Sequence, residues 1–76
     1  MTEAPFASFG FLLRKYRIAA GLTQEELAVR AGMSARGISD LEREARRTPY
    51  KGTVELLAQA LQLSPQEGSA FLAATR

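Results

Sequence analysis

The chain has 76 residues and a formal net charge of +2, and 46% of its residues are hydrophobic. This length fits one small domain, and the hydrophobic content is typical of a globular fold and too high for a disordered tail. The absence of cysteine and histidine excludes disulfides and thiolate metal sites, and it removes the commonest metal ligand and general base. We therefore expect no metal, no cofactor and no enzymatic activity.

Helical periodicity dominates the chain, and no segment alternates between apolar and polar residues as a half-buried strand would. The first predicted helix begins after Ser8, a plausible N-cap, and ends before Gly21. The residues that form its apolar face are Phe9, Leu12, Leu13, Tyr16 and Ala20. We interpret Phe9 and Tyr16 as core residues and not as platforms on which bases stack.

Two helix starts and one helix stop follow within residues 23–43. Thr23 and Glu26 form a capping-box pattern, Gly32 supplies a left-handed stop, and Ser34 caps the next helix. A short turn of this kind sets two helices roughly 90–120° apart, which is the helix-turn-helix motif. The same pattern also fits an ordinary corner between helices, so the turn alone leaves both interpretations open.

The remaining sequence predicts a basic loop and two more helices. Residues 43–51, REARRTPYK, contain four basic residues and one acidic residue. Such a patch either binds polyanions or is a solvated face. The fourth helix is predicted from near Thr53 to Leu61. The fifth begins after Ser64, with Pro65 at its first position and Glu67 at its third.

The segment LTQEELAVRAGMSARGISDLE resembles the core motif of Xre/Cro-type (lambda-repressor-like) helix-turn-helix domains. With its flanks, FGFLLRKYRIAAG before it and TVELLAQALQLSPQE after it, the chain is similar to N-terminal domains of many actinobacterial transcriptional regulators. The resemblance implies an all-α, compact five-helix fold in a single domain over residues 1–76, with the helix-turn-helix core at 23–43. It also implies sequence-specific binding of double-stranded DNA, with the recognition helix, 34–43, in the major groove.

The resemblance further implies roles for individual residues of this sequence. The positions that face bases are Ala35, Arg36, Ser39 and Asp40. Gln24, Arg43 and Arg47 match positions that contact the DNA backbone, and Ser34 matches the cap of the recognition helix. We expect Ser34, Arg46 and Tyr50 to lie near the backbone as well. Arg17 and Glu42 match a structural ion pair between the first and third helices. Glu44 departs from the pattern, because it stands where the family usually has glycine, and a positive φ there would cost glutamate more than glycine.

Three of these residues have a second interpretation. Arg36 either donates a bidentate pair to guanine O6 and N7 or contacts only phosphate. Asp40 either accepts from a cytosine N4 amine or is merely exposed, since a carboxylate on that face repels phosphate. Tyr50 follows Pro49 in the basic loop and either lies against the sugar-phosphate chain or covers the core.

The alternative to DNA binding is a protein–protein interaction module that keeps the fold without strong DNA affinity. The low net charge, Asp40 and Glu44 favour this alternative. A salt titration separates the two functions, because affinity that comes from phosphate neutralisation falls steeply with salt. An enzyme has the least support, since the chain has no glycine-rich loop that cradles phosphate.

No apolar run approaches the roughly 20 residues that span a bilayer, and the start of the chain, MTEAPFASFG, does not resemble a signal peptide. We therefore expect a cytoplasmic, nucleoid-associated protein with no membrane partner. Besides double-stranded DNA, the expected partner is a second copy of the chain, paired on DNA or through a missing domain. The chain is expected to be either a fragment of a longer regulator or a small stand-alone repressor.

Overall fold

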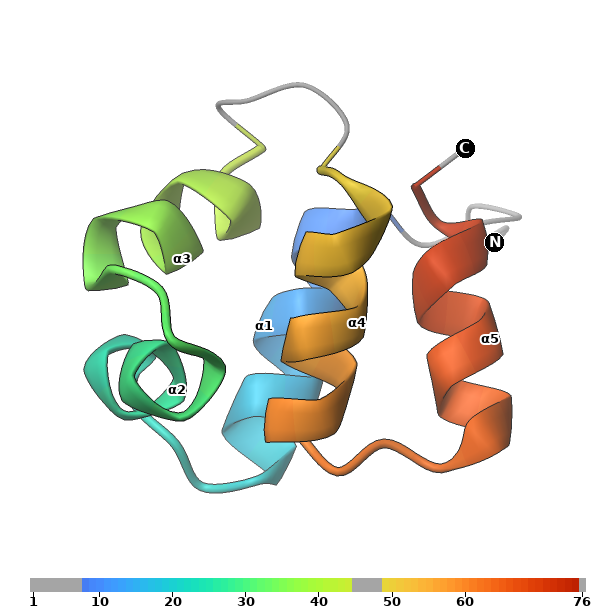
Figure 1. The fold of residues 1–76 in the computed structure, drawn as a ribbon, viewed down its shortest axis with the longest axis horizontal. Coiled ribbons are helices and arrows are strands. Elements are labelled where there is room, and N and C mark those ends of the chain that lie inside the picture. The colour runs from blue at the N-terminus through green and yellow to red at the C-terminus, as the bar shows by residue number, and fades with distance from the viewer. Residues whose placement is uncertain (1–7, 45–48, 76) are drawn as a thin grey trace, which may run out of the picture.

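A computed structural model describes residues 8–44 and 49–75, which form five α-helices (Figure 1). The helices are α1 (Phe9–Ala19), α2 (Gln24–Ala31), α3 (Ala35–Glu42), α4 (Lys51–Ala60) and α5 (Pro65–Ala73). No strand occurs in these two described ranges, so the all-α, five-helix fold expected from the sequence is confirmed. Within the same residues, every helix is too short or too polar to cross a membrane.

The helices surround one core. In Figure 1, α2 and α3 lie to the left of α4, and α5 lies to its right. α2 packs against α3 and α4, whereas α1 packs against α3 and α5. In Figure 1 α2 is seen nearly end-on while α1 and α4 are seen from the side. α2 and α3 therefore form a corner that packs against α1 and α4.

Each helix contributes one large, fully buried side chain to the core. These side chains are Leu13, Leu27, Ile38, Leu57 and Phe71. Burying a side chain of this size contributes about 1.5–3 kcal/mol. Phe9 stacks on Phe71 with ring centroids 4.5 Å apart, and the partly buried Tyr16 meets Phe71 edge-on at 5.8 Å. The core role expected for Phe9 and Tyr16 is confirmed.

Side-chain caps start four of the helices. In each case a hydroxyl accepts from the backbone N–H three residues later, at 3.0–3.2 Å. The capping residues are Ser8, Thr23, Ser34 and Ser64. Glu26 and Glu67 complete capping boxes at α2 and α5 by accepting from the N-cap N–H. These bonds satisfy amides that the helix itself leaves without partners.

Two details of the predicted helices were wrong. α4 begins at Lys51, two residues before the predicted start at Thr53, with Tyr50 as its N-cap. Ala20 was placed on the apolar face of the first helix, but it is exposed and forms the C-cap of α1. The chain turns away there because Gly21 adopts a left-handed φ of 74°.

α1 approaches the end of α3 very closely at Gly10. A Cβ atom built on Gly10 would lie 2.7 Å from the carbonyl oxygens of Leu41 and Glu42, and 2.7 Å from Cγ of Glu44. No side chain fits in that space, so glycine allows this crossing. Glu44 itself has a φ of 56°, the left-handed conformation in which glycine would be less strained.

Candidate nucleic-acid interface

The turn between α2 and α3 is short because each helix end is satisfied locally. Gly32 ends α2 with a φ of 71°, and the next amide, that of Met33, donates to the carbonyl of Ala28 at 2.9 Å. The Ser34 hydroxyl then accepts from the N–H of Gly37 at 3.0 Å and begins α3. The buried Ala28, which is small, lies on the side of α2 that joins the core. α2 therefore supports α3 from below and leaves its other side exposed.

A polar cluster beneath α3 ties three helices together. Arg17 of α1 donates to both carboxylate oxygens of Glu42, from Nε at 2.6 Å and from Nη2 at 3.0 Å. The same guanidinium donates from Nη1 to the carbonyl of Leu22 at 2.9 Å. Only 13% of the Arg17 side chain and 5% of the Glu42 side chain are exposed. The hydrogen bond to Glu42 raises the pKa of Arg17 above its ordinary value, against a lowering by burial. The ion pair expected between the first and third helices is present.

Gln24 belongs to this cluster as well as to the expected phosphate contacts. Its side-chain amide donates to Oε1 of Glu42 at 3.1 Å, which links the first residue of α2 to the last residue of α3. Gln24 is partly buried, and an amide nitrogen has a second N–H. A phosphate contact by Gln24 is therefore compatible with this bond. The bond to Glu42 was not expected from the sequence.

The outward side of α3 combines charges of both signs. Arg36 is exposed, and 64% of the Arg43 side chain is exposed at the C-cap of the helix. Asp40 lies between them in sequence, and its Oδ1 accepts from Nη2 of Arg43 at 2.8 Å. Because only 13% of the Asp40 side chain is exposed, the expectation that it is merely exposed was wrong.

The other residues expected at the interface occupy different environments. Ala35 is partly buried and packs against the core, and Ser39 is partly buried. Ser34 is exposed while its hydroxyl caps α3. Arg46 and Arg47, expected near the DNA backbone, lie outside the described residues.

The start of α4 adds a feature that sequence reasoning missed. Tyr50 is 84% exposed, which rules out the interpretation that it covers the core. It is also the N-cap of α4, and no side chain among the described residues caps that helix. The exposed Lys51 follows it. Uncapped amides at a helix start favour anions. The sequence signals this uncapped start only by the lack of Ser, Thr, Asp or Asn at the N-cap position.

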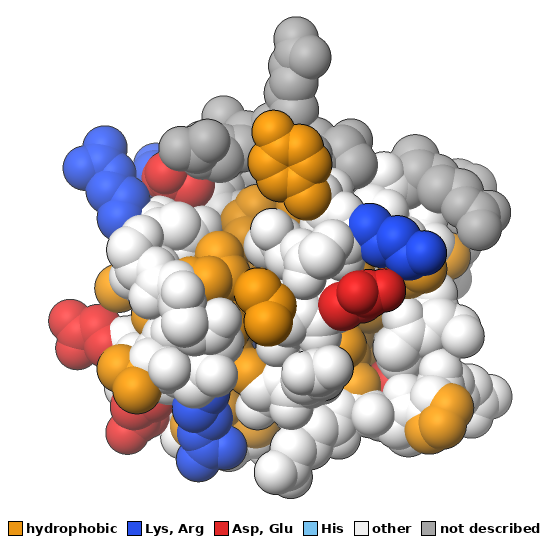
Figure 2. Space-filling model, in the orientation of Figure 1, with side chains coloured by type: hydrophobic (Ala, Val, Ile, Leu, Met, Phe, Trp, Pro, Cys, Tyr) orange, Lys and Arg blue, Asp and Glu red, His pale blue; other side chains and the backbone are white. Residues whose placement is uncertain are grey.

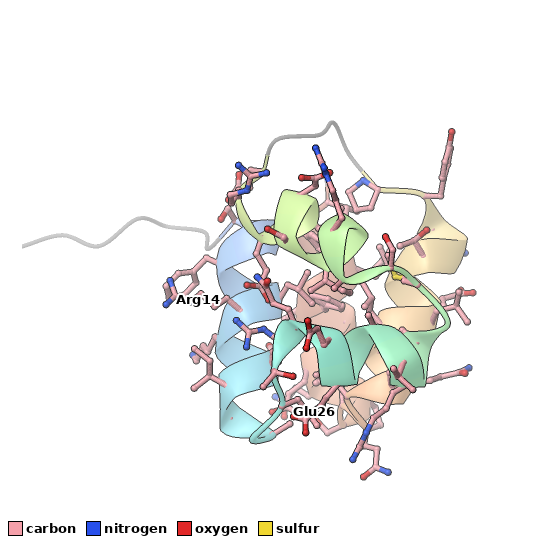
Figure 3. The ribbon with its side chains drawn as sticks, turned by 90° about the vertical axis from the view of Figure 1, so that its left-hand side faces the viewer. Arg14 and Glu26 are labelled. Carbon is pink, nitrogen blue, oxygen red and sulfur yellow. The ribbon has the colours of Figure 1, made fainter. Side chains whose placement is uncertain are left out.

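Figure 2 shows that basic side chains project over α2, over α3 and over the start of α4, with acidic side chains close by. This face therefore does not carry charge of a single sign. Figure 3 views the molecule with α2 and α3 towards the reader, and Arg14 points away from both helices on the outer side of α1. Glu26, at the start of α2, is occupied by its capping box.

Two comparisons with known proteins cover this surface. A family described as "Helix-turn-helix domain" matches residues 8–71, which include every described residue of the candidate interface. The chain is also 42% identical over 66 residues to the HTH-type transcriptional repressor RghR of Bacillus subtilis (strain 168). The matched region is 87% of this chain and 48% of RghR, so the chain spans about half the length of that relative.

Proposed function

Because this chain belongs to the helix-turn-helix domain family, we propose that it binds double-stranded DNA in a sequence-specific manner as the DNA-reading domain of a transcriptional regulator. The observation that carries the proposal is the position of α3. α2 and the partly buried Arg17–Glu42 pair hold its inner side, and its outer side presents Arg36 and Arg43 to solvent. An exposed helix of this kind fits the major groove.

In this proposal α3 enters the groove with its N-terminal half towards the base edges. Arg36 reads a base, for which guanine O6 and N7 are the best-matched acceptors, and Ser39 lies beside it. Base reading rests less on Ala35, Ser39 and Asp40, because these three residues are partly buried. The residues that would hold the DNA backbone are Gln24, Ser34, Arg43, Arg46, Arg47 and Tyr50. Phosphate contacts of this type fix the register and orientation of the helix and carry no sequence information directly.

The wider setting is also part of the proposal. A transcriptional regulator of this family would act in the cytoplasm, on the nucleoid, and its relation to RghR favours a regulator over an enzyme. If two copies bind together, the centres of their half-sites should be about one helical turn, roughly 34–36 Å, apart.

The second candidate function is a protein–protein interaction module. The charges of both signs on the face in Figure 2 favour it, as does the net charge of only +2. The two functions differ in their response to salt, because each phosphate contact contributes to a fall in DNA affinity as salt rises.

The test begins by selecting preferred duplexes from a randomised pool, and then measures affinity by fluorescence anisotropy over a range of salt concentrations. Arg36→Ala should weaken binding to the preferred duplex by about 1–3 kcal/mol and reduce the preference over random duplex. Arg14→Ala is the matched control, since it removes the same charge from the outer side of α1. The control should leave the preference unchanged. A parent protein that binds no duplex at low salt would favour the interaction module.

A further inference from the structure

We infer that Asp40 is a positioning residue for DNA recognition: it fixes the guanidinium of Arg43 at the end of α3 and so increases sequence preference at the expense of general affinity. The inference rests on the proposed function. It assigns to Asp40 a role that acts through Arg43, in place of direct contact with a base.

The geometry of the pair supports this role. Asp40 lies in α3 and Arg43, three positions later, is the C-cap, which places the two side chains on the same side of the helix end. Oδ1 of Asp40 and Nη2 of Arg43 are 2.8 Å apart, a normal distance for a charged hydrogen bond. Asp40 is largely covered, with 13% of its side chain exposed, whereas Arg43 remains 64% exposed. One carboxylate oxygen of Asp40 therefore lies against the Arg43 guanidinium, while most of the Arg43 side chain stays exposed.

A guanidinium has five N–H donors, and the bond to Asp40 occupies one of its nitrogens. The remaining donors of Arg43 can bind a phosphate while Asp40 still holds the group. A side chain that is already held loses less conformational freedom when it binds. A phosphate contact in the correct geometry is therefore stronger. An arginine held in one place is also less able to follow a phosphate backbone that lies in a different register.

The carboxylate has an opposite effect on binding in general. Asp40 places a negative charge beside Arg43, and this charge lowers the attraction of the helix end to any duplex. Charge arrangements of this kind supply specificity more than affinity. Direct reading of a cytosine amine by Asp40 is disfavoured, because its carboxylate is largely covered and already accepts from Arg43.

A double-mutant cycle tests the inference. Asp40→Asn, Arg43→Gln and the double variant are compared with the parent on the preferred duplex and on a random-sequence duplex, across a range of salt concentrations. Asp40→Asn should tighten binding to the random duplex and reduce the preference ratio about fivefold, the low end of the discrimination that one side-chain contact supplies. Asp40→Glu, which keeps a carboxylate, should restore part of the ratio. A purely structural role would not produce this rescue together with a changed ratio.

The same cycle can overturn the inference. In the Arg43→Gln background, Asp40→Asn should leave the ratio unchanged, and an equal fall in both backgrounds would show that Asp40 acts independently of Arg43, through a base or another group. An unchanged ratio in a parent that binds specifically would also refute the role. A parent that binds no duplex overturns the proposed function together with this inference. Because the pair is partly exposed, the melting temperature should change by less than about 4–8 °C, and a larger loss would indicate that Asp40 serves the fold.

Discussion

Replacing Arg17 with methionine should destabilise the domain by about 3–5 kcal/mol, the usual cost of leaving a buried charge without its partner. Glu42 would lose both of its bonds from Arg17 and keep the bond from Gln24. The carbonyl of Leu22 would lose a donor as well. Only 5% of the Glu42 side chain is exposed, so little water can replace the guanidinium.

That loss is large for a chain of 76 residues. At roughly 0.05–0.15 kcal/mol per residue, its total free energy of unfolding should be about 4–11 kcal/mol. Urea unfolding followed by far-ultraviolet circular dichroism measures the difference directly. Arg17→Met should therefore unfold at a much lower urea concentration than the parent, with a similar dependence on urea if its unfolding remains two-state.

A second variant tests whether the unpaired carboxylate of Glu42 causes the loss of stability. Arg17→Met combined with Glu42→Gln removes both charges, and a buried ion pair that is replaced as a whole often costs little. The double variant should therefore be more stable than Arg17→Met alone. A loss below about 1 kcal/mol in Arg17→Met, as for an exposed pair, would refute the reasoning. So would a double variant that is no more stable than the single one.

Three further changes test other parts of the fold. Glu44→Gly should stabilise the domain by about 1 kcal/mol, because it relieves a φ of 56°, and DNA affinity should stay the same or rise; weaker binding would show a positive role for Glu44. Gly10→Ala should cost about 1–3 kcal/mol in urea unfolding despite the better helix propensity of alanine, since its Cβ would meet backbone oxygens at 2.7 Å; an equally stable variant would contradict the close approach. Burial raises the pKa of Tyr16 above its ordinary value of 10.0, and Glu67 raises it further. The phenol therefore ionises more readily in the unfolded chain, so the stability that Tyr16 contributes should be present below about pH 10 and lost at higher pH. Tyr16→Phe should remove this part of the pH dependence, and an identical alkaline profile in parent and variant would count against it.

The starts of four helices were predictable because each depends on a local bond between a hydroxyl and an amide three residues later. The start of α4 was placed two residues late, because Tyr50 offers no capping side chain and Gly52 is not a typical helical residue. Local patterns therefore locate a helix end only where a side chain marks it.

Contacts between helices were predictable to a smaller extent. The Arg17–Glu42 pair followed from a family resemblance and not from spacing along the chain. The bond from Gln24 to Glu42 and the absence of room at Gly10 depend on how the helices cross. No pattern along a single helix specifies that geometry, and so the sequence did not predict either feature.

In the candidate site too, the local pattern was predictable and the contacts between side chains were not. Helical periodicity places Ile38 and Leu41 on one side of α3 and Arg36 on the other, and the structure agrees. The covered position of Asp40 and its bond to Arg43 depend on side-chain conformations, which the sequence alone does not determine. Exposure of a face was therefore easier to predict than the pairing of charges on it.

The two sides of α3 have consequences for how such a domain can change over generations. Ile38, Leu41 and Glu42 attach the helix to the rest of the protein, while Arg36 points outward. Substitutions at outward positions of this kind usually alter stability by less than about 0.5 kcal/mol. If α3 reads DNA as proposed, a lineage of duplicated copies can exchange Arg36 and acquire new target preferences on an unchanged scaffold.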